Sequence, residues 1–247
     1  TNPVWIAWEE RSTVVVNKFF PHLYFARMDV SALGLSEFKN WYDTKHAPDL
    51  IDAGFYSAQA YHCYVGGPLV CNLYEIRDSE IFYTTSYQQK RTVEHDPQRP
   101  HILEMVSNRS NTVYSQVATV GVALPKKEWE SNYQIGAVES TVISTTRFEV
   151  PKARESYLDR WVREQEFPYL SAQVGCCGAR LGRQAGRPHP ANPSKEPNWV
   201  LLSEWVDQES ASITQADGGM AQRMVENGFE PMQVSHNLAV RVTRARM

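Results

Sequence analysis

The sequence has little cysteine and no large excess of charge of either sign. Its 247 residues include four cysteines, 25 lysines plus arginines and 28 aspartates plus glutamates, which give a formal charge of −3. Domains that bind nucleic acid usually carry a basic patch, so this balance argues against such a partner. None of the cysteines forms a C-x-x-C pair, and reduced thiols are therefore expected.

Long hydrophobic runs and short signature motifs are also missing. No stretch of about 18 apolar residues is present, so no membrane span or membrane partner is expected. Residues 1–11 lack the charged segment and apolar run of a signal peptide, which predicts a cytoplasmic protein. H-E-x-x-H, P-loop and G-x-G-x-x-G patterns do not occur, so we predict no metal site, no nucleotide and no cofactor.

The chain does contain one long-range repetition, in which arginine, tryptophan and proline recur at a spacing of 120 positions. The first copy has Arg27, Trp41 and Pro48, and the second has Arg147, Trp161 and Pro168. A repeated unit of this length predicts a duplicated half-domain and not a solenoid. His46 of the first copy stands where the second has Glu166, and this difference is the best lead to function.

Hydrophobic patterning predicts the same order of elements in each copy. In the first, residues 22–30, 55–65, 69–76 and 112–124 are expected to form strands, and 37–46, 79–91 and 102–107 helices. Ser36 is the expected N-cap, and the regular helix should end near His46 because Pro48 follows. In the second copy the strands are expected at 138–150, 176–183, 198–206 and 232–243. Its helices are expected after Pro151 and over 207–227.

Each copy therefore follows the β-α-β-β-α-β order of a ferredoxin-like unit. We predict an arm (1–17), a first repeat (18–124), a connector (125–137) and a second repeat (138–247). Such a sheet has one face covered by helices and one bare face that must be buried. The predicted fold class is thus α+β, with two tandem ferredoxin-like repeats whose antiparallel sheets pack face to face as an α/β barrel.

Two segments carry a resemblance to a known family. FKNWYDTKHAPDLIDAGFYSAQAYH followed by VCNLYEI resembles the dimeric α/β-barrel superfamily, in particular EthD-like proteins. YLDRWVREQEFPYLSAQVGCCGARLGR followed by WVLLSEWVD looks like a diverged copy without the histidine. The resemblance implies the barrel fold over most of residues 22–243. It does not fix the reaction, because members include cofactor-free monooxygenases, polyketide cyclases, isomerases, aldoxime dehydratases and haem enzymes.

His46 is the first catalytic candidate, because imidazole exchanges protons near neutral pH. Asp49 is predicted to orient its ring, and Tyr61 or Tyr74 to hold a substrate oxygen. The alternative for His46 is a residue that only caps the last helical carbonyls. The alternative for each tyrosine is core packing with a satisfied hydroxyl.

Further polar side chains on the predicted strands are candidate substrate-binding residues: Tyr24, Arg27, His62, Asn72, Tyr74, Glu75 and Arg147. Alternation along the strand places Tyr61 on one face and His62 on the other. The sequence does not decide which of the two faces lines the pocket. Arginine and glutamate at matching mid-strand positions favour structural ion pairs over binding of a substrate carboxylate.

Three features of the loops leave alternatives open. His95 and His101 bracket a proline-rich segment that is either a lid or an ordinary surface loop, and the loop is favoured. His189 lies in a loop of similar character. Cys63 and Cys71 flank Gly66-Gly67 and could approach each other across a hairpin, although a disulfide is not the favoured state.

The leading functional hypothesis is a cofactor-independent acid/base enzyme of the lyase, cyclase, isomerase or dehydratase type, in aromatic compound metabolism. Its substrate would be a small aromatic or polyketide-like molecule bound within the barrel of the N-terminal half. The alternatives are a cofactor-free or haem monooxygenase and a non-catalytic small-molecule binder. A homodimer is possible if sheet edges are exposed.

Overall fold

The computed structural model describes residues 21–121, 138 and 140–246. The predicted arm (1–17) and connector (125–137) lie outside the described residues. Eight strands form one closed antiparallel barrel in the order β1-β3-β2-β8-β5-β7-β6-β4. The predicted α+β fold with two sheets joined face to face as a barrel is confirmed.

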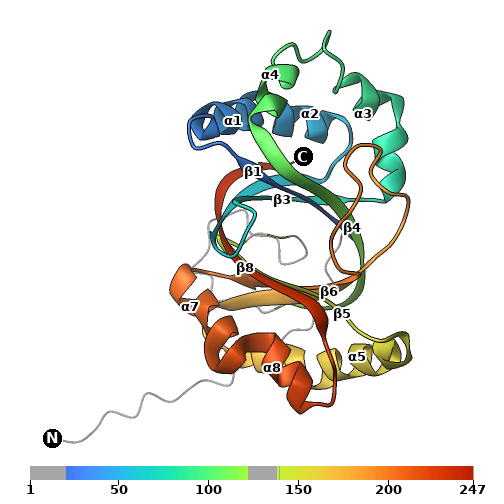
Figure 1. Ribbon diagram of the computed structural model, residues 1–247, viewed down its shortest axis with the longest axis vertical. Helices are drawn as coiled ribbons and strands as arrows, with labels where there is room; N and C mark the ends of the chain where they lie inside the picture. The colour runs from blue at the N-terminus through green and yellow to red at the C-terminus, as the bar shows by residue number, and fades with distance from the viewer. Residues whose placement is uncertain (1–20, 122–137, 139, 247) are drawn as a thin grey trace, which may run out of the picture.

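The N-terminal half supplies four strands and the helices at one end of the molecule in Figure 1. Its strands are β1 (His22–Val30), β2 (Ser57–Val65), β3 (Val70–Ile76) and β4 (Val106–Gly121). Its helical segments are α1 (Leu35–Trp41), η1 (Tyr42–His46), α2 (Ala47–Asp52), η2 (Ser79–Tyr83), α3 (Thr85–Gln89) and α4 (Arg99–Glu104).

The C-terminal half repeats this order with its helices at the opposite end of the barrel. Its strands are β5 (Val142–Glu149), β6 (Cys176–Gln184), β7 (Trp199–Trp205) and β8 (Met232–Arg246). Its helical segments are η4 (Lys152–Arg154), α5 (Glu155–Trp161), η5 (Val162–Glu166), α6 (Phe167–Ala172), α7 (Gln208–Ser212), η6 (Ile213–Gly218) and α8 (Gly219–Glu226).

The long last strand of each half closes the barrel by pairing with the other half. β4 pairs with β6, and β8 pairs with β2. Because every described strand has a neighbour on both sides, the sheet-edge argument for a homodimer does not apply, and dimerisation stays a prediction. No helix within the described residues is long and apolar enough to cross a membrane.

The two faces of the sheet are buried by different partners. Every residue of β3 and of β7 is buried, because one face points into the barrel and the other packs under helices. Side chains that include Phe25, Tyr61, Leu73 and Ile143 fill the interior from both halves. Their strand neighbours, such as Tyr24 and Tyr74, instead join the core beneath α1–α4.

The first helix runs further than the sequence predicts. A π turn over Tyr42–His46, in which the Ala47 N–H bonds to the Tyr42 carbonyl, connects α1 directly to α2. This i→i−5 hydrogen bond shifts the backbone hydrogen-bonding pattern, so that Pro48 lies in the first turn of α2. The missing N–H of a proline costs little stability at that position. The predicted end at His46 is therefore wrong. The predicted Ser36 cap is also wrong, because the N-cap is Gly34.

Candidate active site

A cavity of about 170 Å³ lies between the outer face of the N-terminal sheet and helices α1–α4. It is lined by Tyr24, Ala26, Met28, Phe38, Trp41, His46, Leu50, Asn72, Tyr74, Tyr87, Arg91, Arg99, Leu103, Arg109, Asn111, His189, Ala191 and Asn192. The sequence predicted a site within the barrel, whereas the cavity that contains His46 lies outside it, beneath the helices.

His46 lies in this cavity at the end of the π turn. Its ring stacks on Trp41 with centroids 4.6 Å apart and an interplanar angle of 12°, which fixes its orientation. Within the described part of the chain, no hydrogen bond reaches either ring nitrogen of His46, so both are free for a ligand. Burial, reinforced by the charges of Arg99 and Arg91, holds the pKa of His46 well below its ordinary value. The imidazole is thus neutral at pH 7.

Asp49 does not orient His46 as predicted. One turn further along the helix, its carboxylate accepts from His95 Nε2 at 2.9 Å and pairs with Lys45 at 3.2 Å and Lys90 at 3.4 Å. These contacts, His95 and Lys45 foremost, outweigh its burial and lower the pKa of Asp49. The spacing of three residues between His46 and Asp49 allows a contact. The Asp49 carboxylate nevertheless faces the α3–α4 connection and not the cavity.

A stack of rings forms the wall of the cavity opposite the helices. Tyr24 stacks on Tyr74 with centroids 5.0 Å apart, and on His189 at 5.6 Å. The Tyr24 hydroxyl donates to Asn111 Oδ1 at 2.9 Å. Burial raises the pKa of both tyrosines, so each keeps its proton and can donate it in a hydrogen bond.

Asn72 lies beside this stack on β3 and reaches the cavity as predicted. Its side chain is buried, and its Oδ1 atom has no hydrogen-bond partner. A buried amide oxygen without a donor carries a desolvation cost, which a ligand hydroxyl or N–H would remove.

The connection between β6 and β7 reaches from the C-terminal half toward the helices of the N-terminal half (Figure 1). Its residues His189, Ala191 and Asn192 line the cavity. His189 lies at its tip, with Nε2 at 2.8 Å from the Tyr87 hydroxyl and Nδ1 at 3.1 Å from Asn111 Nδ2. The Tyr83 hydroxyl donates to the Pro188 carbonyl at 2.5 Å and anchors the same segment. Burial is the main cause that lowers the pKa of His189 to about 4.

The other predicted site residues do not line the cavity. Tyr61 points into the barrel interior, where its hydroxyl donates to the Ser140 carbonyl at 3.0 Å. It therefore cannot share a substrate with His46. His62 is partly buried on the other face of β2 and is not among the lining residues.

The mid-strand charges form structural ion pairs inside the barrel, although not with the partners that sequence symmetry suggests. Glu75 accepts from Arg180 Nη2 at 2.8 Å. Arg27 Nη1 donates to Glu196 Oε2 at 2.5 Å, and Arg147 Nε lies 3.8 Å from the same oxygen. None of Arg27, Glu75 and Arg147 reaches the cavity that contains His46.

Several cavity residues had no motif to reveal them. Arg91 enters from the turn after α3, Arg99 from α4, Arg109 from β4 and Tyr87 from α3. The segment between His95 and His101, for which a surface loop was favoured over a lid, does contain Arg99, but the two histidines themselves point elsewhere. His95 pairs with Asp49, and His101 lies 3.3 Å from Glu37 at the surface. All four cysteines are free thiols. No group of three or more metal-ligand side chains occurs among the described residues.

Comparison with known proteins gives structural likeness only. No protein-family model and no curated protein sequence matches the chain. A candidate monooxygenase from Lactobacillus acidophilus aligns with a TM-score of 0.58 and 12% identity, over 92% of this chain and 96% of that one. An anthrone oxidase-like protein aligns with a TM-score of 0.60 and 10% identity, over 94% and 96%.

A second candidate monooxygenase, from Fusobacterium nucleatum, aligns with a TM-score of 0.55 and 9% identity, over 92% of this chain and 94% of that one. At identities this low, the alignments establish a shared fold and nothing about chemistry. The α+β barrel is thus a fold that this chain has in common with these proteins.

Proposed function

We propose that the chain is an enzyme in which His46 removes a proton from a small aromatic or polyketide-like substrate bound in the cavity. The observation that carries the proposal is an imidazole that lines an aromatic cavity with both nitrogens free and its pKa held low. A neutral imidazole at pH 7 is ready to act as a general base. The resemblance to EthD-like proteins and the origin by self-duplication belong to this proposal.

The cavity residues have complementary tasks in such a step. Tyr24 and Tyr74 form part of the aromatic wall against which the ring of the substrate packs. His46 takes the proton of an acidic C–H or O–H, and the electron pair of the broken bond moves onto a substrate oxygen. Arg91 and Arg99 stabilise the resulting enolate or phenolate by charge. The same arginines keep His46 unprotonated before the reaction, because two cations disfavour a third.

Deuterium exchange tests this proposal without knowledge of the natural substrate. The wild-type protein should accelerate exchange of the benzylic CH₂ of phenylacetone in D₂O, followed by proton NMR. We expect His46→Ala to lower that rate by about 10²–10⁴-fold. His101→Gln removes an imidazole that is 60% exposed outside the cavity, and it should exchange at the wild-type rate. Equal rates in wild type and His46→Ala would refute the role of His46.

A second candidate function is oxidation of the same anion by O₂, as in a cofactor-free monooxygenase or oxidase. The three structural neighbours favour it, since each is described as a monooxygenase or as anthrone oxidase-like. In that case a substrate CH₂ and one O₂ give a carbonyl and one water. An oxygen electrode separates the two functions: proton transfer proceeds under nitrogen, whereas oxidation consumes one O₂ for each substrate and stops without it.

A further inference from the structure

We infer that the cavity selects a hydroxylated single-ring aromatic acid, whose carboxylate is bound by Arg91 and Arg99. The inference names the substrate class of the site in the proposed function and rests on it to that extent. Arg91, Arg99 and Arg109 line the cavity, and no aspartate or glutamate does so among the described residues. A hollow with cationic side chains and no carboxylate attracts an anion.

Arg99 contributes a specific hydrogen-bond donor to this excess of positive charge. Its side chain is 13% exposed, and its Nη1 atom has no hydrogen-bond partner. The carboxylate of Asp96 is 4.0 Å away, beyond hydrogen-bond distance, and accepts from Trp41 Nε1 at 3.0 Å instead. Asp96 is therefore an ion-pair partner that makes no hydrogen bond to Arg99, and the Nη1 donor remains for the carboxylate of a ligand.

Arg91 presents a second unpartnered donor to the same cavity. Its Nε atom is buried without a hydrogen-bond partner, and its guanidinium lies over the Tyr87 ring at 5.2 Å. Arg99 lies over Trp41 in the same way at 5.7 Å. Cation–π contacts of this kind hold the guanidinium groups in place, but they leave the N–H donors free for a carboxylate.

The size of the cavity limits the ring system. Its volume of about 170 Å³ is close to the roughly 150 Å³ of an engineered apolar cavity that binds benzene. One six-membered ring with small substituents therefore fits. A fused three-ring skeleton fits only if part of it stays outside the cavity. The unpartnered Oδ1 of Asn72 accepts from a donor, which favours a ring hydroxyl.

Benzoate and benzamide test the inference, since they have nearly the same shape and differ in charge. We expect calorimetry at pH 7 to show that benzoate binds about 10- to 100-fold more tightly than benzamide, the ratio typical of a charge-assisted hydrogen bond. Arg99→Gln should bring this ratio close to one, Arg91→Gln should lower it, and Arg99→Lys should retain part of it. Arg77→Gln, at an arginine 82% exposed outside the cavity, is the matched control and should keep the full ratio.

The outcomes separate this inference from the proposed function. Equal binding of the two probes by the wild type, binding of neither at millimolar concentration, or a ratio that survives both glutamine variants would overturn it. Circular dichroism and the melting temperature identify any variant that fails to fold, and Arg99→Lys then carries the test. A benzoate preference without any His46-dependent proton exchange leaves the inference standing and removes the function. The reverse pattern removes only the inference.

Discussion

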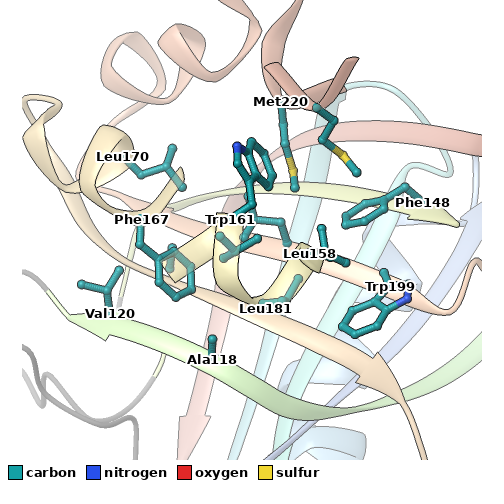
Figure 2. Close-up of a cluster of buried hydrophobic side chains, with 14 of the residues drawn as sticks. Ala118, Val120, Phe148, Leu158, Trp161, Phe167, Leu170, Leu181, Trp199 and Met220 are labelled. Carbon is teal, nitrogen blue, oxygen red and sulfur yellow. The ribbon is translucent and has the colours of Figure 1, made fainter. Parts of the chain in front are cut away.

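The two halves of the barrel share a topology but use the space beneath their helices differently. In the N-terminal half this space is the cavity with His46. In the C-terminal half it is filled by a hydrophobic cluster in which Trp161, Phe148, Leu158 and Phe167 pack together, as Figure 2 shows. The same topology therefore surrounds a cavity in one half and a packed hydrophobic cluster in the other.

The difference between the two halves can be followed at matching strand positions. Tyr24 and Tyr74 are paired neighbours on β1 and β3, and the corresponding neighbours on β5 and β7 are Ser144 and Ser203. Both serines make hydrogen bonds to neighbouring side chains. Ser144 donates to the Thr214 hydroxyl, and Ser203 accepts from the Trp205 indole N–H. The tyrosine rings that border the cavity in the N-terminal half thus correspond to small serines in the C-terminal half. The hydrophobic core of the C-terminal half includes Trp161.

The π turn shows the same contrast. Both halves contain it, over Tyr42–His46 and Val162–Glu166, immediately before a proline-containing α-helix. In the C-terminal half its last residue, Glu166, is 1% exposed and accepts two bonds from Arg223, at 2.9 and 2.6 Å. His46 at the equivalent place has no such partner. Both halves thus share the π turn, and they differ in whether its last side chain is held by a hydrogen bond.

Truncating the equivalent tryptophans should have the largest effect and break the comparison most directly. Trp161→Ala should lower the free energy of unfolding by about 3–5 kcal/mol, because it empties a closed core. It should leave benzoate affinity unchanged. Trp41→Ala should cost less stability, because one side of this indole already borders a cavity, but it should abolish binding. Urea unfolding and calorimetry measure both. Equal loss of binding in the two variants would contradict the assignment of the site to one half.

Replacing the last residue of each π turn with glutamine is the next test in size. Glu166→Gln leaves Arg223 without its buried carboxylate and should cost about 3 kcal/mol in unfolding free energy. Activity should persist. His46→Gln removes no hydrogen bond and should change stability by less than about 1 kcal/mol while activity is lost. A His46→Gln variant as unstable as Glu166→Gln would show that His46 is a structural residue.

Much of the fold was within reach of the sequence, because it depends on patterns that are local. The run HLYFARMDV is β1 exactly, and the β-α-β-β-α-β order of both halves follows from alternation, turns and caps. The helix was predicted to end at His46, because a proline at position 48 ordinarily stops a helix. The π turn realigns the backbone hydrogen bonds, so the helix continues through Pro48. Boundaries such as these depend on backbone geometry that residue spacing does not encode.

The site was less accessible, because it depends on contacts between distant segments. His46, Tyr24, Asn72 and Tyr74 were predicted and do line the cavity. Asp49 and Tyr61 satisfied spacing rules, but they face other partners. Arg99 begins α4 and His189 lies in the β6–β7 connection, and the approach of both segments to β1 depends on tertiary contacts. Their only signal in the sequence was the chemistry of the proline-rich segments around them.

The pH dependence of stability is small over any one pH unit, and it sharpens the comparison further. The pKa of His189 is about 4 in the folded chain, against about 6.5 in the unfolded one. Above pH 6.5 neither state binds the proton, and the stability from this group is complete. As the pH falls from 6.5 to 4, only the unfolded chain gains the proton, so stability should decrease by up to about 1.4 kcal/mol per pH unit. Below pH 4 this contribution to the slope ends. His46 acts with the same sign, and so does His236, whose pKa burial lowers to about 4.

The variant His189→Asn should flatten this slope by the share of one histidine, as measured from urea midpoints between pH 7 and 4. Asparagine retains a polar group toward Tyr87 and Asn111, so the loop keeps an anchor. His101→Gln is the control substitution, because it replaces a surface imidazole that is 60% exposed and lies outside the cavity. Bound benzoate adds negative charge beside the same imidazoles and should reduce the acid sensitivity of the wild type. An equal slope in wild type and His189→Asn would mean that this histidine is protonated alike in both states, and that the covering loop does not exclude solvent from the cavity.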